Sequence, residues 1–177
     1  VDRLPSGHSM TIDVKKRKIK IDRYFKVEFG NTDKSFDEVV KDISTAMKDS
    51  TEHLLISDVE VGSFLSSGVD SSYLVILAKP DKTYTIGFDL AKYSEIDYAK
   101  DLTDKLNIKN ISEKISKEEY MNALSEVYYH MDEPTADGCA IAVYFLSRLA
   151  SKDVKVVLSG EGADEFFGGY NSYDDNF

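Results

Sequence analysis

The sequence predicts an α/β protein in which helices cover both faces of a parallel sheet. Strand-like segments alternate along the chain with segments whose apolar residues recur at helical spacing. The chain has 177 residues, of which 42% are hydrophobic, so one domain with a sizeable core can form. A formal net charge of -10 and the lack of a long apolar run argue against nucleic acid or a membrane as a partner. The single cysteine, Cys139, excludes an internal disulfide, and the cytoplasm fits this composition best.

A short β connector is expected ahead of this sheet, over residues 1–30. Segments 9–14 and 19–29 alternate apolar and polar residues as half-buried strands do, and they flank the basic stretch 15–20. Because lysines commonly protect exposed strand edges, we interpret the basic stretch as a solvated hairpin edge rather than as a nucleic-acid site. Residues 31–177 then form the main domain.

The main domain is expected to open with an amphipathic helix, because the apolar residues after Ser35 recur at helical spacing. Ser35 and Ser116 are each followed three residues later by a glutamate, which is the capping-box form of a helix start. The other boundaries follow from changes between strand and helix periodicity. The expected elements are a helix over 35–54, a strand over 59–65, a buried helix over 71–78, a strand over 83–88, a helix over 94–107, a strand over 108–115, a helix over 117–131, a helix over 139–150 and a strand over 154–159.

The first candidate site is the loop "SSGVDSS", residues 66–72, between a strand and a helix. Gly68 allows a ligand to approach the backbone, the serines offer hydroxyl donors, and the start of the helix offers N–H groups with a favourable dipole. These features predict a phosphate cradle, although the lysine of a P-loop is missing. A carboxylate beside phosphates is repulsive unless a divalent cation bridges them, so Asp70 predicts Mg²⁺. The alternative is that the serines only cap the helix.

The second candidate site is "SGEGADE", residues 159–165, which follows the last expected strand. Two glycines again permit close approach, and three carboxylates follow within a few residues. Acids this close repel one another unless a cation or a substrate ammonium meets them. The alternative is a solvated acidic turn. Ligands bind beyond the carboxyl ends of parallel strands, so both loops belong to the same edge of the sheet.

These two loops together resemble those of a known enzyme family. The stretch "FLSSGVDSS" resembles the pyrophosphate loop of the N-type ATP pyrophosphatases, and "VVLSGEGADEFFGGY" is similar to the second signature of glutamine-hydrolysing asparagine synthetases. "LPSGHSM", "YTIGF" and "MDEPTADGCAI" fit the same family in the same order. The resemblance implies an adenine nucleotide alpha hydrolase-like fold of the ATP pyrophosphatase type. It also implies synthesis of asparagine from aspartate and ATP through a β-aspartyl-adenylate, with release of AMP and pyrophosphate.

The resemblance also implies roles for individual residues. Leu65 and Ile86 are expected to contact the nucleoside, the serines with Gly68 the pyrophosphate, and residues 159–160 the AMP part. Asp70 and Asp164 are expected to bind Mg²⁺. Glu161 is the acidic residue at the reacting centre, which takes a proton from the incoming ammonia, and it forms the catalytic set with these two aspartates. The expected ATP-binding residues are Leu65, Ser66, Gly68, Ser71, Ser72, Ile86, Ser159 and Gly160.

The sequence departs from the family pattern at several places. Ser67 stands where many members have glycine, which is tolerable if the backbone there has a negative φ. Residue 1 is Val1 and not the nucleophilic cysteine of the family's amide-hydrolysing domain, and Cys139 is expected to lie in the core. The chain stops at Phe177, before the helices that carry the family's catalytic lysine. We therefore expect a fragment, truncated at its C-terminus and inactive by itself.

The implied partners are aspartate, and ammonia that a missing N-terminal glutaminase domain releases from glutamine. A homodimer is the expected assembly, although the sequence itself does not give the oligomeric state. Two alternatives stay open. A related amide-forming synthetase, similar to β-lactam synthetases or peptide-cyclising enzymes, would use the same loops on another carboxylate. A non-catalytic scaffold would keep the fold and lose turnover.

Overall fold

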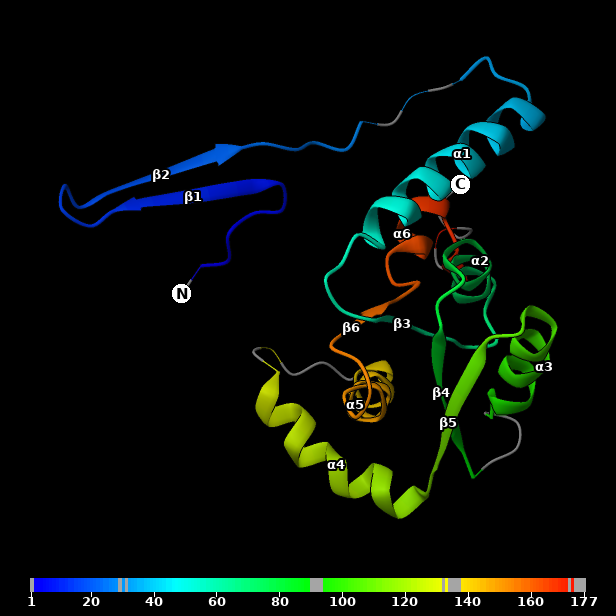
Figure 1. Ribbon diagram of the computed structural model, residues 1–177. Coiled ribbons are helices and arrows are strands. Elements are labelled where there is room, and N and C mark those ends of the chain that lie inside the picture. Colours follow the sequence, from blue (N-terminus) through cyan, green and yellow to red (C-terminus); the bar gives the residue numbers. More distant parts are fainter. Residues whose placement is uncertain are drawn as a thin grey trace. The chain divides into compact units, whose positions relative to one another are not determined.

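A computed structural model describes residues 2–28, 30, 32–89, 94–131, 133, 138–171 and 173 (Figure 1). The chain separates into two compact units, residues 1–41 and 42–177, and each is described by itself. The predicted domain boundary after residue 30 stays a prediction. Within the described residues, no helix is long and apolar enough to cross a membrane.

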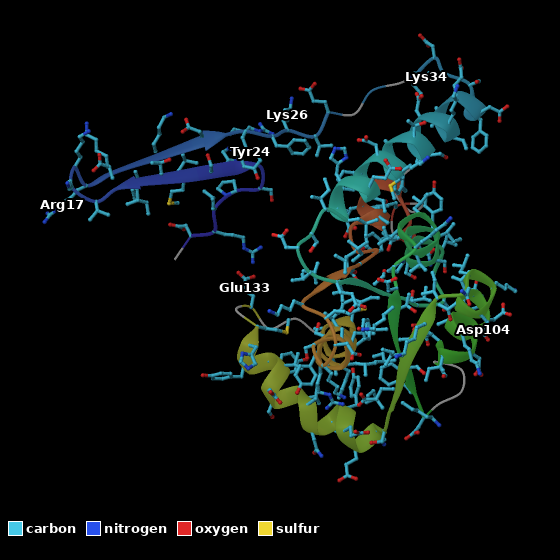
Figure 2. The ribbon with its side chains drawn as sticks, in the orientation of Figure 1. Arg17, Tyr24, Lys26, Lys34, Asp104 and Glu133 are labelled. Carbon is cyan, nitrogen blue, oxygen red and sulfur yellow. The ribbon has the colours of Figure 1, made fainter. Side chains whose placement is uncertain are left out.

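The first unit contains an antiparallel hairpin of β1 (His8–Asp13) and β2 (Lys18–Arg23). Arg17 ends the connecting turn in the left-handed region, with a φ of 53° (Figure 2). The second strand was predicted to continue to residue 29, but it ends at Arg23. The pairing stops there because Arg23 faces His8, the first residue of β1, and the preceding Gly7 turns the chain with a φ of 70°.

The predicted capping box begins α1 (Phe36–Leu54). The backbone N–H and the hydroxyl of Ser35 both donate to Glu38 Oε2, at 2.8 and 2.7 Å, and these bonds lower the pKa of the Glu38 carboxyl. The amphipathic helix expected here is present. Phe36 is 81% exposed, and Thr51 is the buried residue of the helix.

The second unit is built on a parallel sheet, as predicted. Its strands are β3 (Val61–Phe64), β4 (Lys82–Phe88), β5 (Lys109–Ile115) and β6 (Val156–Leu158), in the order β5-β4-β3-β6. Every neighbouring pair is parallel. The helices that follow these strands are α2 (Val69–Ala78), α3 (Ile96–Leu106), α4 (Lys117–His130), α5 (Cys139–Ala150) and α6 (Ala163–Phe167).

Helices cover both faces of this sheet, which confirms the predicted fold class (Figure 1). On one face, Tyr84 and Ile86 of β4 pack against residues of α5, and α4 adds Val127. On the other face, Val75 of α2 and Ala99 of α3 pack with Leu65. The expected helices and strands of this unit are all present, with boundaries moved by at most two residues. The short helix α6 was not predicted.

Candidate functional site

Two loops meet at one edge of the sheet, where β3 and β6 end. These strands pair in parallel, with Val61 opposite Val156 and Ser63 opposite Leu158. The chain forms β4 and β5 on one side of β3 and then returns to add β6 on the other, so the strand order reverses between β3 and β6. In open α/β sheets, ligands bind at such a switch point. We refer to residues 65–68 as the β3 loop and to residues 159–162 as the β6 loop.

A cavity of about 230 Å³ is lined by both loops. It is lined by every residue that the sequence assigned to the site, with the exception of Ser72. The hydroxyl of Ser72 donates to the carbonyl of Gly68, one helical turn back, at 2.7 Å. The residues around the cavity are Phe64, Leu65, Ser66, Gly68, Asp70, Ser71, Ile86, Glu95, Val143, Leu146, Ser159, Gly160, Glu161, Gly162, Asp164 and Tyr170.

The β3 loop is organised around the buried hydroxyl of Ser71. This oxygen accepts from the backbone N–H of Ser66 at 3.1 Å and lies 2.8 Å from the Ser66 hydroxyl. The hydroxyl oxygen of Ser66 in turn accepts from the N–H of Gly68 at 3.1 Å. Two of the predicted serines, Ser66 and Ser71, therefore stabilise the conformation of the loop, and both also line the cavity.

The serines of this loop do not cap α2. Gly68 occupies the N-cap position with a φ of -73° and a ψ of 155°, and no side chain caps the helix there. The first backbone N–H groups of α2 therefore keep their capacity to bind an anion, and the helix dipole favours one. The alternative that the serines only cap a helix does not fit this geometry.

Ser67 adopts a backbone conformation that any residue can adopt. Among the described residues, the non-glycine residues with positive φ are Arg17, Lys79 and Asn107. Ser67 is not one of them, so the replacement of a glycine at this position introduces no left-handed strain. Serine is therefore tolerated in place of glycine at position 67, because the backbone there does not have a positive φ.

The β6 loop depends on glycines. A Cβ on Gly160 would lie 3.1 Å from the backbone nitrogen of Ser71 and 3.4 Å from Asp70 Cβ, so the absence of a side chain lets this loop approach the start of α2. Gly162 has a φ of 93°, which favours glycine. Further along, a Cβ on Gly169 would overlap the carboxylate of Asp164. The glycines of this segment therefore determine where the acidic residues that follow β6 lie.

Part of the cavity lining is apolar. Leu65 is 2% exposed and Ile86 is 5% exposed, and Val143 and Leu146 of α5 lie on the same lining. The hydroxyl of Thr85 donates to the carbonyl of Leu65 at 2.9 Å and anchors the first residue of the β3 loop to β4. An apolar wall next to N–H donors suits a ligand with a flat apolar part and an anionic part.

Another part of the lining is acidic. Asp70, Glu95, Glu161 and Asp164 line the cavity, and no lysine, arginine or histidine among the described residues does so. Within the described residues, no cluster of three or more acidic, histidine or cysteine side chains is close enough to hold a metal ion by protein ligands alone. These carboxylates therefore do not form a complete metal cage, and an incoming ligand would have to share the coordination of any cation.

Tyr170 also lines the cavity. Its hydroxyl donates to Glu165 Oε1 at 2.8 Å. This hydrogen bond, together with desolvation and the nearby charges of Glu165 and Asp164, raises the pKa of Tyr170 to about 12. The phenol therefore stays neutral well above physiological pH and remains a donor.

Sequence reasoning missed five residues of the lining that have side chains, namely Phe64, Glu95, Val143, Leu146 and Tyr170. Glu95 directly precedes α3, beyond the carboxyl end of β4, and an acid at that edge of a parallel sheet was the available signal. Val143 and Leu146 come from α5, and its mostly apolar sequence does not indicate which residues face a ligand. Cys139 was expected in the core, but it is exposed because it is the first residue of α5.

The fold and the site define an α/β protein with a ligand cavity at its switch point, shaped for an anion and an apolar group. Comparison with known sequences narrows this class. The asparagine synthase family profile matches residues 42–177, so the chain belongs to the asparagine synthase family. The matched region thus covers the whole second unit and none of residues 1–41.

Two relatives come from Bacillus subtilis (strain 168). Asparagine synthetase [glutamine-hydrolyzing] 1 is 49% identical over 154 residues, which are 85% of this chain and 24% of the relative. Asparagine synthetase [glutamine-hydrolyzing] 3 is 30% identical over 189 residues, which are 96% of this chain and 30% of the relative. Among solved structures, NMN synthetase from Francisella tularensis has a TM-score of 0.48 and 21% identity, and the likeness covers 78% of this chain and 59% of that one. The chain thus spans less than a third of the length of these two relatives.

Proposed function

We propose that this chain forms the ATP-binding part of a glutamine-hydrolysing asparagine synthetase. A side-chain carboxylate oxygen of aspartate attacks the α-phosphorus of ATP, and the bond from that phosphorus to the pyrophosphate oxygen breaks. The products of this step are β-aspartyl-adenylate and pyrophosphate. Ammonia then attacks the acyl carbon, loses a proton, and displaces AMP to leave asparagine.

One observation carries the proposal. Two glycine-containing loops from adjacent parallel strands line a single cavity at the switch point of the sheet, and both carry the residues that the family resemblance assigns to ATP. Membership of the asparagine synthase family supports the same reading. Cleavage at the α-phosphorus requires a site that holds the whole pyrophosphate as a leaving group, and the uncapped start of α2 offers donors for it.

Each part of the cavity has a proposed role. The apolar part of the lining, with Leu65 and Ile86, takes the nucleoside, and Ser159 with Gly160 contacts the AMP part. The β3 loop holds the pyrophosphate through its N–H groups and the hydroxyls of its serines. Glu161 accepts a proton from the attacking ammonia. Ser72 keeps its proposed pyrophosphate role only if its hydroxyl turns away from the carbonyl of Gly68.

Magnesium fits the acidic part of the lining. A triphosphate placed among four carboxylates, with no basic side chain among the described lining residues, would be strongly repelled without a cation. Oxygen ligands are those that Mg²⁺ prefers, and it commonly binds through one or two carboxylates plus substrate phosphates. We propose Asp70 and Asp164 as these carboxylates. When bound, Mg²⁺ neutralises the charge that collects on the leaving pyrophosphate.

The remaining predictions concern the whole protein. Aspartate and glutamine-derived ammonia are the proposed substrates, and a glutaminase domain is the proposed source of the ammonia. A homodimer, a cytoplasmic location and the inactivity of this chain when isolated stay predictions.

The test is exchange of labelled pyrophosphate into ATP by the full-length protein, measured with and without aspartate. Exchange that requires aspartate and Mg²⁺ is the expected result, because it reports reversible formation of the adenylate. Exchange with another carboxylic acid, but not with aspartate, would move the protein to the β-lactam synthetase-like or peptide-cyclising enzymes. No exchange with any acid, together with tight MgATP binding, would favour a non-catalytic scaffold.

A further inference from the structure

Glu95 adds a carboxylate to the cavity that has no role in the function proposed above. The backbone N–H and the hydroxyl of Ser67 both donate to the same oxygen, Glu95 Oε1, at 3.3 and 2.9 Å. Ser67 belongs to the β3 loop, whereas Glu95 follows β4 and directly precedes α3. The contact therefore joins the carboxyl ends of two neighbouring strands at the edge where the cavity lies.

The donors of Ser67 differ from the other donors of the β3 loop. The N–H groups of Ser66 and Gly68 donate to serine hydroxyls within the same segment of the chain. The N–H group and the hydroxyl of Ser67 instead donate to the carboxylate of Glu95, which lies outside the loop. An N–H group and a hydroxyl that converge on one negatively charged oxygen offer the same environment that a phosphate oxygen requires.

The charge of Glu95 is also distinct from that of the other acids. Asp70 and Asp164 are the proposed Mg²⁺ ligands, so a cation would offset their charges. Among the residues that the structure describes, no lysine, arginine or histidine lines the cavity, so this described lining supplies no cation to offset the charge of Glu95. A carboxylate that stayed at this place would repel the phosphates of an incoming nucleotide.

We propose that Glu95 holds the place of a phosphate in the nucleotide-free protein. Its carboxylate keeps the two donors of Ser67 in position and yields them when the pyrophosphate part of the nucleotide enters the β3 loop. Glu95 is thus a positioning residue, because it acts on the loop and not on the reacting atoms. The inference rests on the proposed function, since it requires pyrophosphate to bind in this loop.

The test is calorimetric titration of the full-length protein with inorganic pyrophosphate, with Mg²⁺ and again without it. Glu95→Gln keeps an oxygen that can accept from Ser67 but loses the charge, so it should bind pyrophosphate about 10-fold more tightly than the native protein. The gain should be larger without Mg²⁺, because fewer cations then screen the carboxylate. The matched control is Asp97→Asn, an equal charge change two residues away, in the first turn of α3 and outside the cavity lining. It should change affinity by less than about 2-fold.

A second variant separates this role from a merely structural one. Glu95→Ala removes both the charge and the contact with Ser67, and it should also bind pyrophosphate more tightly than the native protein. Weaker binding by both variants would overturn the inference, and a steeper Mg²⁺ dependence in that case would make Glu95 a metal ligand. If both variants bound pyrophosphate as tightly as the native protein, the contact between Glu95 and Ser67 would be only structural, which would also contradict the inference. If the native protein bound no pyrophosphate, the proposed function would fail together with this inference, whereas native binding with unaltered variants contradicts the inference alone.

Discussion

The β3 loop and the β6 loop reach the same cavity by opposite means. Hydroxyl groups shape the β3 loop, with the buried Ser71 as the central acceptor. Missing side chains shape the β6 loop, where Gly160 permits close approach and Gly162 adopts a positive φ. The comparison suggests that changes in the hydroxyl loop alter folding stability, while changes in the glycine loop alter ligand geometry. Asp70 follows the β3 loop and Asp164 follows the β6 loop, and both are proposed to bind the Mg²⁺ of the ligand.

The largest effect is expected from an acid beside the hydroxyl loop. Asp70→Asn should weaken MgATP binding by about 100-fold, because a proposed Mg²⁺ ligand loses its charge. Calorimetric titration at fixed Mg²⁺ measures this effect. Asp81→Asn is the control, since Asp81 directly precedes β4 and therefore lies at the opposite edge of the sheet. Equal affinities for the two variants would sink the proposed role of Asp70.

The hydroxyl at the centre of the β3 loop should matter for stability. Ser71→Ala should lower the free energy of unfolding by about 1–2 kcal/mol, because the N–H of Ser66 loses its acceptor and the hydroxyl of Ser66 loses its hydrogen-bond partner. Urea unfolding followed by circular dichroism measures it. The neighbouring Ser72→Ala is the matched control and should change stability by less than about 0.5 kcal/mol, since its exposed hydroxyl donates to the carbonyl of Gly68, the N-cap residue of the same helix. Equal losses for the two serines would contradict the central position of Ser71.

A methyl group on the glycine loop should act mainly on the ligand. Gly160→Ala places a Cβ 3.1 Å from the nitrogen of Ser71, so the β6 loop has to move back by a few tenths of an ångström. We expect about 5-fold weaker MgATP binding, with the unfolding free energy lowered by less than about 1 kcal/mol. Gly30→Ala, where a Cβ meets no atom within 4 Å, is the control. A large loss of stability with unchanged affinity would reverse the comparison between the loops.

The smallest effect is expected away from both loops. Tyr84 is fully buried, and its hydroxyl is the one side-chain polar atom buried without a hydrogen-bond partner among the described residues. Burial also raises the pKa of this phenol. Tyr84→Phe removes an unsatisfied group, so stability should stay within about 0.5 kcal/mol of the native value or rise. Tyr144→Phe is the comparison, because it removes a hydrogen bond to Glu126. If Tyr84→Phe lowered the unfolding free energy more than Tyr144→Phe did, the hydroxyl of Tyr84 would not be unpaired.

Much of this site could be predicted from sequence because its chemistry is local. Glycines, serines and acids lie within a few residues of each other in each loop, and the alternation of strands and helices indicates that both loops share one edge. Glu95 could not be predicted in the same way, because its partner Ser67 is 28 residues away along the chain. The helix α6 has only five residues, which is too short for a periodic pattern to identify.

The first unit and α1 show a second limit of sequence patterns. The alternation that continued past Arg23 predicted a longer strand, but a strand needs a partner, and β1 begins at His8. In α1 the periodicity predicted the shared face but not what covers it, and Phe36 is exposed. A local pattern describes a residue's neighbours within an element, whereas strand pairing and burial depend on distant parts of the chain.

The central claim is that the two loops bind one nucleotide through one cation, and a double-mutant cycle tests it most directly. MgATP affinity is measured for the full-length protein, for Asp70→Asn, for Asp164→Asn and for the double variant. If both aspartates hold the same Mg²⁺, each single change should weaken binding by about 100-fold, and the double change by little more than that. Independent losses that multiply to about 10,000-fold would mean that the two aspartates act at separate places, and would contradict a shared site.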